Sequence, residues 1–159
     1  RITADRDRIA IHSEEYYRSL FEIARELPEP DLLLLLAYHE SELLAGIVVA
    51  RYRRGAYYLY GASSNEKRNL MPSYALQWEA IRRCKELGAG SYDFFGIPPA
   101  ENPKHPMHGL YRFKVGFGGD LVDRPGAYDL PVRRFGYGLY RPAEAARDYY
   151  HKVIKKRER

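Results

Sequence analysis

A single lysine stands among apolar and glycine neighbours in residues 110–119, LYRFKVGFGG. The segment is predicted to open as a short helix with Leu110, Phe113 and Phe117 on one face, and its glycines end that helix. Lys114 lies just before that end, where a cation beside apolar groups loses water and can stabilise a negative charge that develops close by. The alternative is a lysine that points at solvent near a helix C-terminus, where the helix dipole favours it.

Other polar side chains stand at the ends of two predicted strands. Asp93 comes where a strand opens toward a loop, so it is a candidate for orienting an amine or, equally, for capping loop amides. Tyr58 and Tyr60 alternate on one strand and are expected on the same face, one of them packed in the core. Tyr60, Ser63 and Ser64 lie where the strand meets the loop and could hydrogen-bond a peptide or a sugar, and Tyr58 is a further candidate for substrate binding.

Two sets of residues suggest phosphate or metal. Arg68, with Lys67, precedes a predicted helix and could meet phosphate, or could belong to a solvated loop. His105 and His108 have only Glu101 as a nearby acidic partner, so no metal site is predicted. The chain offers no Ser-His-Asp or Cys-His set, which favours direct transfer over a covalent enzyme intermediate in any acyl transfer.

Hydrophobic periodicity and turn residues define the elements that would position these side chains. Ser13 caps a helix that Pro28 ends, and Pro72 begins a second helix that Gly88 stops. A last helix is expected to start at Pro142. Strands are predicted at residues 31–38, 43–52, 56–61 and 91–95, with one or two more in 121–132 and a proline-rich loop at 96–108.

Two predictions concern what is buried. The five leucines within residues 31–38 favour a strand buried on both faces. In the Pro72 helix the buried stripe is predicted to comprise four residues, namely Tyr74, Trp78, Ile81 and Cys84. Cys84 is therefore expected to be a core residue and not a nucleophile.

Composition and charge limit the class of protein. The 159 residues are 45% hydrophobic and 30% charged, and the longest apolar run is far too short to span a membrane, which predicts one soluble globular domain. The single cysteine excludes a disulfide framework. Much of the net charge of +5 lies in residues 147–159, either a solvated helix end or a surface for RNA or anionic lipid. Because the chain begins at Arg1, in what reads as mid-helix, we expect a fragment of a longer protein.

The predicted order is a helix, three antiparallel strands, a helix, a strand, a helix and a strand. This α/β pattern, a mixed and mainly antiparallel sheet flanked by helices, resembles the GCN5-related N-acetyltransferase (GNAT) fold. That fold normally carries Arg/Gln-x-x-Gly-x-Gly/Ala before the central helix, to hold the pyrophosphate of coenzyme A. Residues 63–73 contain no glycine, and Pro72 lacks an amide donor, so no cofactor is predicted.

Five short sequence segments, in this order along the chain, resemble the FemABX family of peptidoglycan-bridge aminoacyltransferases. They are DRIAIHS at 7–13 with Tyr16 and Tyr17, YLYGASS at 58–64, LQWEAI at 76–81, YDFFGI at 92–97 and YRFKVGFGG at 111–119. The resemblance implies that the chain is the second of that family's two GNAT-like halves, with the N-terminal half absent. It also implies that Lys114 is the lysine associated with catalysis, and that the backbone carbonyl of Phe113 contacts the reacting amine.

The same resemblance implies a reaction and its partners. An amino acid would move from aminoacyl-tRNA to the stem-peptide amine of a lipid-linked or nucleotide-linked peptidoglycan precursor. The protein would act in the cytoplasm, with peripheral contact at the inner membrane face as an option. Two alternatives remain open, a coenzyme A-dependent N-acyltransferase and a non-catalytic module that binds peptide or RNA.

Overall fold

The computed structural model describes residues 12–98 and 100–150. The DRIAI part of the first of these sequence segments (residues 7–11) and most of the basic tail therefore lie outside the described residues. The chain divides into two compact units, one up to Gly119 and one from Asp120 onward, and each is described by itself.

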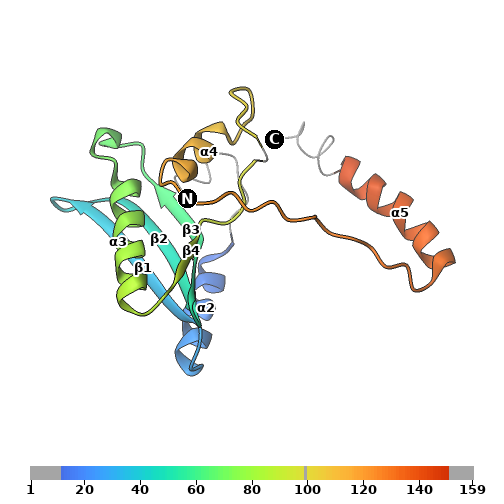
Figure 1. Cartoon of the computed structure of the whole chain (residues 1–159), viewed down its shortest axis with the longest axis horizontal. Helices are drawn as coiled ribbons and strands as arrows, with labels where there is room; N and C mark the ends of the chain where they lie inside the picture. Colours follow the sequence, from blue (N-terminus) through green and yellow to red (C-terminus); the bar gives the residue numbers. More distant parts are fainter. Residues whose placement is uncertain (1–11, 99, 151–159) are drawn as a thin grey trace. The chain divides into compact units, whose positions relative to one another are not determined.

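The first unit is built on one four-stranded sheet (Figure 1). Its strands are β1 (Asp31–His39), β2 (Glu42–Tyr52), β3 (Gly55–Ser63) and β4 (Ser91–Asp93), in the spatial order β1-β2-β3-β4. The first three pair antiparallel and β4 runs parallel to β3. The predicted mixed, mainly antiparallel α/β sheet is confirmed.

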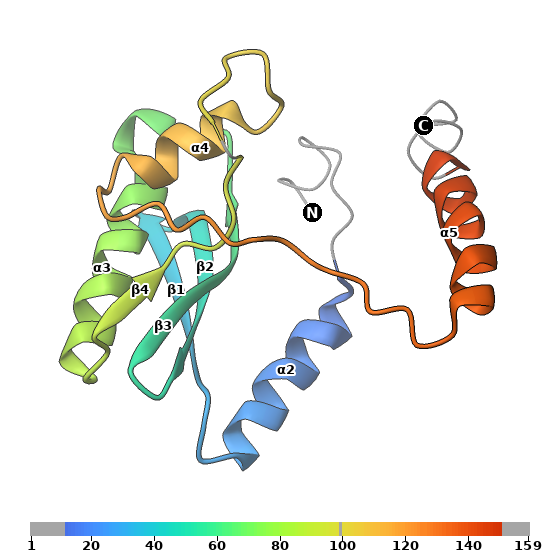
Figure 2. The ribbon, with the colours of Figure 1, turned by 45° about the vertical axis from the view of Figure 1, so that its right-hand side comes forward.

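The helices of this unit begin where the capping residues predict. In α2 (Glu14–Glu26) the Ser13 hydroxyl accepts the Tyr16 N–H at 3.3 Å. Pro72 is the first residue of α3 (Pro72–Glu86), which follows the short 3-10 helix η1 (Arg68–Leu70). The lysine segment forms α4 (His108–Val115). Helices α2 and α3 lie on opposite faces of the sheet (Figure 2).

The core lies between α3 and the sheet. Its fully buried members are small or branched, namely Leu35, Ala45, Ile47, Val49, Ala56, Leu76, Ala80 and Cys84. The predicted stripe of α3 is correct for Cys84 and wrong for Trp78, which is 65% exposed, and for Tyr74. The helix presents Leu76, Gln77 and Ala80 instead, because small residues on both sides bring helix and sheet into close contact where an indole would not fit.

The prediction that β1 is buried on both faces is wrong. Its burial alternates, with Leu35 in the core and Leu34 54% exposed on the opposite face. β1 is one of the two edge strands of the sheet, and α2 covers its outer face only in part. A run of leucines is compatible with either arrangement, because leucine tolerates partial exposure at an edge.

A β-bulge in β3 separates two tyrosines that simple alternation places together. Val49 pairs with Tyr58 and Val48 pairs with Tyr60, so Leu59 is an extra residue without a partner in the ladder. Relative to regular alternation, one extra residue moves each later side chain of the strand to the other face of the sheet. Tyr58 therefore packs on the α3 side, whereas Tyr60 meets Tyr16 and Tyr17 of α2. The prediction that both share a face is wrong.

The second unit has a helix and no strand within its described residues, 120–150. The strands predicted in residues 121–132 are not formed, because no neighbouring strand pairs with that segment. Helix α5 (Arg134–Tyr149) begins eight residues before Pro142, which lies inside it, so the predicted start is wrong. The proline removes one helical N–H, but alanines on its C-terminal side keep the helix favourable. Among the described residues, no helix has the length and apolarity needed to cross a membrane.

Candidate functional site

The site forms where β3 and β4 separate. Their parallel ladder ends at the pair Tyr57 and Asp93, although β3 continues to Ser63. Beyond Asp93 the chain leaves the sheet through Phe94 and Gly96. Contacts between aromatic rings hold helix α4 beside this point. The end of the ladder leaves a stretch of β3 without a β4 neighbour, and side chains from α3 and α4 approach it.

Ring contacts hold α4 in place. The Tyr74 ring of α3 meets Phe113 at 4.8 Å and Phe117 at 5.4 Å between centroids, and Phe117 meets Phe94 at 5.0 Å. Such pairs add packing energy and fix relative orientation. The apolar face predicted for residues 110–117 thus becomes the contact between α4 and its neighbours, and the lysine between the two phenylalanines is drawn inward.

Lys114 is buried, with 8% of its surface exposed. Its Nζ donates a hydrogen bond to the Gly96 carbonyl oxygen at 3.0 Å and lies 5.7 Å from the centroid of the Tyr58 ring. Burial lowers the pKa of Lys114 below its ordinary value of 10.5, and the nearby Asp93 carboxylate partly opposes this shift. The solvent-pointing alternative is wrong, and the lysine has the dry, restricted setting that an electrostatic role requires.

A polar cluster lies beneath the lysine. The Tyr92 hydroxyl donates to Oε1 of Gln77 at 2.7 Å, and Gln77 is completely buried on α3. The Gln77 amide also faces Tyr58, whose pKa is raised by burial and to a smaller extent lowered by Gln77. The Tyr58 hydroxyl lies so close to Gly61 that a Cβ there would stand 1.9 Å from it. The Tyr58 side chain therefore extends along β3 toward Gly61, and the Lys114 ammonium lies over its ring.

Asp93 caps the loop that follows it, which is one of the two roles that its position suggested. Its Oδ1 accepts the Phe95 N–H at 2.7 Å, which caps the turn in which Phe95 has a positive φ of 61°. Its charge also acts on Lys114. The carboxylate is therefore held rigidly by the loop while it stabilises the ammonium.

Tyr60 does not join Lys114, because the bulge turns it toward α2. Its hydroxyl lies 3.0 Å from that of Tyr16, a contact that, with partial burial, raises the pKa of Tyr60 to about 12. The rings of His12 and Tyr17 complete this second cluster. Tyr58 and Tyr60, two candidate substrate-binding residues predicted to share a face, belong to two different faces of the sheet.

The remaining predicted site residues occupy the end of β3 and the loop that follows. Ser63 is the last residue of β3, opposite Ala45, and the Ser64 hydroxyl accepts the Glu66 N–H at 3.2 Å. Arg68 is exposed at the start of η1. The neighbouring Lys67 pairs with Glu42 at 3.0 Å. Of these groups, only Arg68 keeps an exposed cation.

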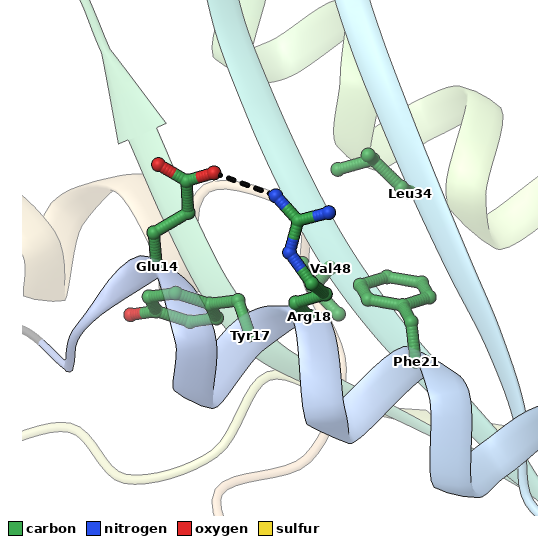
Figure 3. A pocket seen from close by; sticks show the side chains of 6 residues that line it. All are labelled: Glu14, Tyr17, Arg18, Phe21, Leu34 and Val48. Carbon is green, nitrogen blue, oxygen red and sulfur yellow. Dashed lines mark hydrogen bonds and ion pairs between the residues drawn. The ribbon is translucent and has the colours of Figure 1, made fainter.

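A groove of about 280 Å³ lies on the other face of the sheet (Figure 3). It is lined by Glu14, Tyr17, Arg18 and Phe21 of α2 with Leu34 of β1 and Val48 of β2. Glu14 and Arg18 pair with each other at 3.0 Å at its border. The groove results from the partial cover that α2 gives the sheet and is separate from the lysine site, which lies on the α3 side.

Sequence reasoning missed Gln77, Tyr92 and the Gly96 carbonyl. A signal existed for Gln77, because it is spaced three and seven residues from Ala80 and Cys84 and so falls on the buried stripe as its polar member. A carbonyl acceptor such as that of Gly96 has no sequence signature. In the described parts of the chain, no three potential metal ligands come together.

The fold and the family follow from comparison with known proteins. The structure is similar to AAC(6')-Iy in complex with the bisubstrate analogue CoA-S-monomethyl-acetylneamine, with a TM-score of 0.54, 10% identity and coverage of 75% of this chain and 81% of that one. The mixed sheet with its flanking helices is thus a GNAT-like fold. The sequence profile of the FemAB family matches residues 34–145, and the chain belongs to that family.

Curated relatives include two enzymes named lipid II:glycine glycyltransferase. The one from Staphylococcus haemolyticus is 35% identical over 110 residues, which are 69% of this chain and 26% of that protein. The one from Staphylococcus saprophyticus is 34% identical over 105 residues, 66% of this chain and 25% of that protein. The chain thus spans about a quarter of the length of these relatives.

Proposed function

We propose that this chain forms part of an aminoacyltransferase that moves an amino acid from aminoacyl-tRNA to the stem-peptide amine of a peptidoglycan precursor. FemAB membership and the lipid II:glycine glycyltransferase relatives support the precursor as acceptor. We further propose that the chain is the C-terminal GNAT-like half of a longer two-half protein, acting in the cytoplasm with peripheral contact at the inner membrane face.

The buried ammonium of Lys114 is the observation that carries this proposal. In aminolysis of an ester, the acceptor nitrogen bonds to the carbonyl carbon and loses a proton, the C–O bond to the tRNA ribose breaks, and the ribose oxygen takes up a proton. Negative charge gathers on the carbonyl oxygen in between. A cation fixed by the Gly96 carbonyl and the Tyr58 ring can stabilise that oxygen with little reorganisation.

The neighbouring residues have supporting roles in this proposal. Asp93 orients the incoming amine as well as Lys114, and the Phe113 backbone carbonyl contacts that amine. Tyr58 packs against the ammonium. Ser63, Ser64 and Arg68, at the end of β3 and in η1, contact the precursor or the phosphates of its carrier.

The test replaces Lys114 by methionine, which keeps the length and the apolar contacts of the side chain. We expect Lys114→Met to lower transfer about 10²-fold, because one lost stabilising charge raises the barrier by about 3 kcal/mol. The assay uses the protein with the natural residues that flank this chain, glycyl-tRNA and lipid II.

Lys104→Met is the matched control, since Lys104 lies exposed in the loop before α4. It should transfer at the rate of the unaltered protein. Full activity of Lys114→Met, with Lys104→Met also active, would show that Lys114 has a structural role only and would overturn the proposed mechanism.

A further inference from the structure

Gln77 is an anomaly in the core of the first unit. It has no exposed surface, yet it carries an amide among Leu76, Ala80 and Cys84. Burying an amide costs free energy unless its hydrogen bonds are satisfied, so leucine or methionine would pack there more favourably. A residue whose polarity opposes stability at its position suggests a role other than packing.

The two ends of the Gln77 amide have different surroundings. Oε1 is fixed by the Tyr92 hydroxyl at 2.7 Å. Nε2 has no hydrogen-bond partner in the part of the chain that the structure describes. The Tyr58 side chain packs against this same buried face of α3, where burial raises the pKa of its hydroxyl and Gln77 lowers it to a smaller extent.

The next link is the ring that Tyr58 presents to Lys114. At its hydroxyl end the side chain passes over Gly61, where no Cβ stands in the way. Along its face lies the Lys114 ammonium, 5.7 Å from the ring centroid. The position of the ring therefore decides which surface the ammonium contacts and how far it can move toward Asp93.

We infer that Gln77 is a positioning residue: fixed by Tyr92, it holds the Tyr58 side chain in the orientation that places the Lys114 ammonium for transfer. The contacts run from β4 through α3 and β3 to α4, and each link is one named side chain. This inference rests on the proposed function only for its effect on transfer, because the placement of Lys114 is a property of the protein itself.

The experiment compares Gln77→Met, Tyr58→Phe and the double variant. Methionine preserves the volume of Gln77 without its amide, and phenylalanine preserves the Tyr58 ring without its hydroxyl. Lys85→Met is the matched control, since it introduces the same residue on the exposed face of α3. Each variant is assayed for kcat and for KM with glycyl-tRNA and lipid II, alongside thermal unfolding.

A second readout is the NMR signal of the Lys114 ε-methylene in lysine-labelled protein, assigned with Lys114→Met. The Tyr58 ring shifts this signal by its ring current, and Tyr58→Leu gives the limit without the ring. A side chain that serves only the stability of the fold would change the melting temperature and leave this signal in place.

We expect Gln77→Met and Tyr58→Phe each to lower kcat about tenfold, with KM changed less than about twofold. The double variant should be no slower than the slower single variant, because both changes break the same link. The Lys114 signal should move toward its position in Tyr58→Leu. The control should match the unaltered protein in all three respects.

An unchanged Lys114 signal in Gln77→Met would overturn the inference, whatever happens to transfer. Additive losses of kcat in the double variant would do the same. If Gln77→Met does not fold, Tyr92→Phe tests the same link by releasing Oε1, and an unmoved signal there contradicts the inference equally. Full activity of Lys114→Met would instead remove the proposed function, and the signal would still decide whether Gln77 positions Lys114.

Discussion

The burial and the fixed position of the Lys114 ammonium both result from its neighbours. The phenylalanines around Lys114 hold α4 in place, the Gly96 carbonyl oxygen accepts a hydrogen bond from its ammonium, and the Tyr58 ring faces its charge. The sequence indicated the apolar surroundings but left open whether the ammonium pointed inward. That choice depends on a carbonyl and a ring that are distant along the chain, and side-chain spacing within one helix carries no information about them.

The lowered pKa of Lys114 leads to a prediction about pH. Because a lysine is charged only below its pKa, stabilisation by the ammonium should be lost as the pH rises through a value below 10.5. We therefore expect transfer to fall on the alkaline side below pH 10.5. Lys114→Arg, which stays charged across this range, should remove that alkaline limb even if its maximum rate is lower. An alkaline limb identical in both proteins would contradict the assignment.

Gly61→Ala tests the course of the Tyr58 side chain. The added Cβ would meet the Tyr58 hydroxyl at 1.9 Å and the ring at 2.8 Å, so the ring must move away from its place beside Lys114. We expect transfer to fall about tenfold, while the melting temperature changes by about a few degrees or less, since Gly61 is exposed.

Gly109→Ala in α4 is the control for this substitution. A Cβ at Gly109 meets no atom within 4 Å, and alanine favours a helix. Activity should be unchanged. Equal rates for Gly61→Ala and Gly109→Ala would show that the position of the Tyr58 ring does not matter for transfer.

At the scale of elements, backbone amides in the connection between β3 and α3 already donate hydrogen bonds within that connection. The Leu70 N–H donates to the Lys67 carbonyl at 2.9 Å and the Met71 N–H to the Arg68 carbonyl at 3.0 Å. Pro72, the next residue, has no N–H to offer. A pyrophosphate needs several free amides at such a helix start, so this segment is a poor site for coenzyme A.

We therefore predict that acetyl-coenzyme A does not bind specifically. Calorimetric titration into the 159-residue chain should give no saturable heat. Saturable binding with a dissociation constant in the micromolar range would contradict the prediction and would favour a coenzyme A-dependent acyltransferase.

The sequence predicts a helix or strand well where residues within that element determine it. It predicts poorly those features that depend on packing or pairing with another element. Ser13 and Pro72 mark the starts of α2 and α3 because caps and proline act on their own backbone. The face that α3 buries and the partial exposure of β1 depend on the shape of the opposite layer. The segment 121–132 has residues that suit a strand but no strand to pair with, and pairing is what a sheet requires.

At the scale of the whole molecule, the chain contains one sheet with a core but covers only about a quarter of its curated relatives. We predict that the 159-residue chain folds yet transfers no measurable amino acid alone, because a tRNA and a lipid-linked peptide need a larger surface to exclude water and hold both substrates. Assaying the chain beside the longer natural protein checks this. Transfer by the chain within tenfold of that protein would contradict it.

The bulge at Leu59 marks the one position within β3 where a residue can be lost without exchanging the faces of the strand. Deleting Leu59 would leave Tyr58 opposite Val49, Tyr60 opposite Val48 and Gly61 on its present face, now in a regular ladder. Substitutions along this strand alter one face at a time, whereas a gain or loss of one residue outside the bulge exchanges the faces of all that follow. Variation in this strand among natural proteins should therefore consist of replacements or of loss of the bulge residue, and its length should drift far less than that of the loop after Ser64.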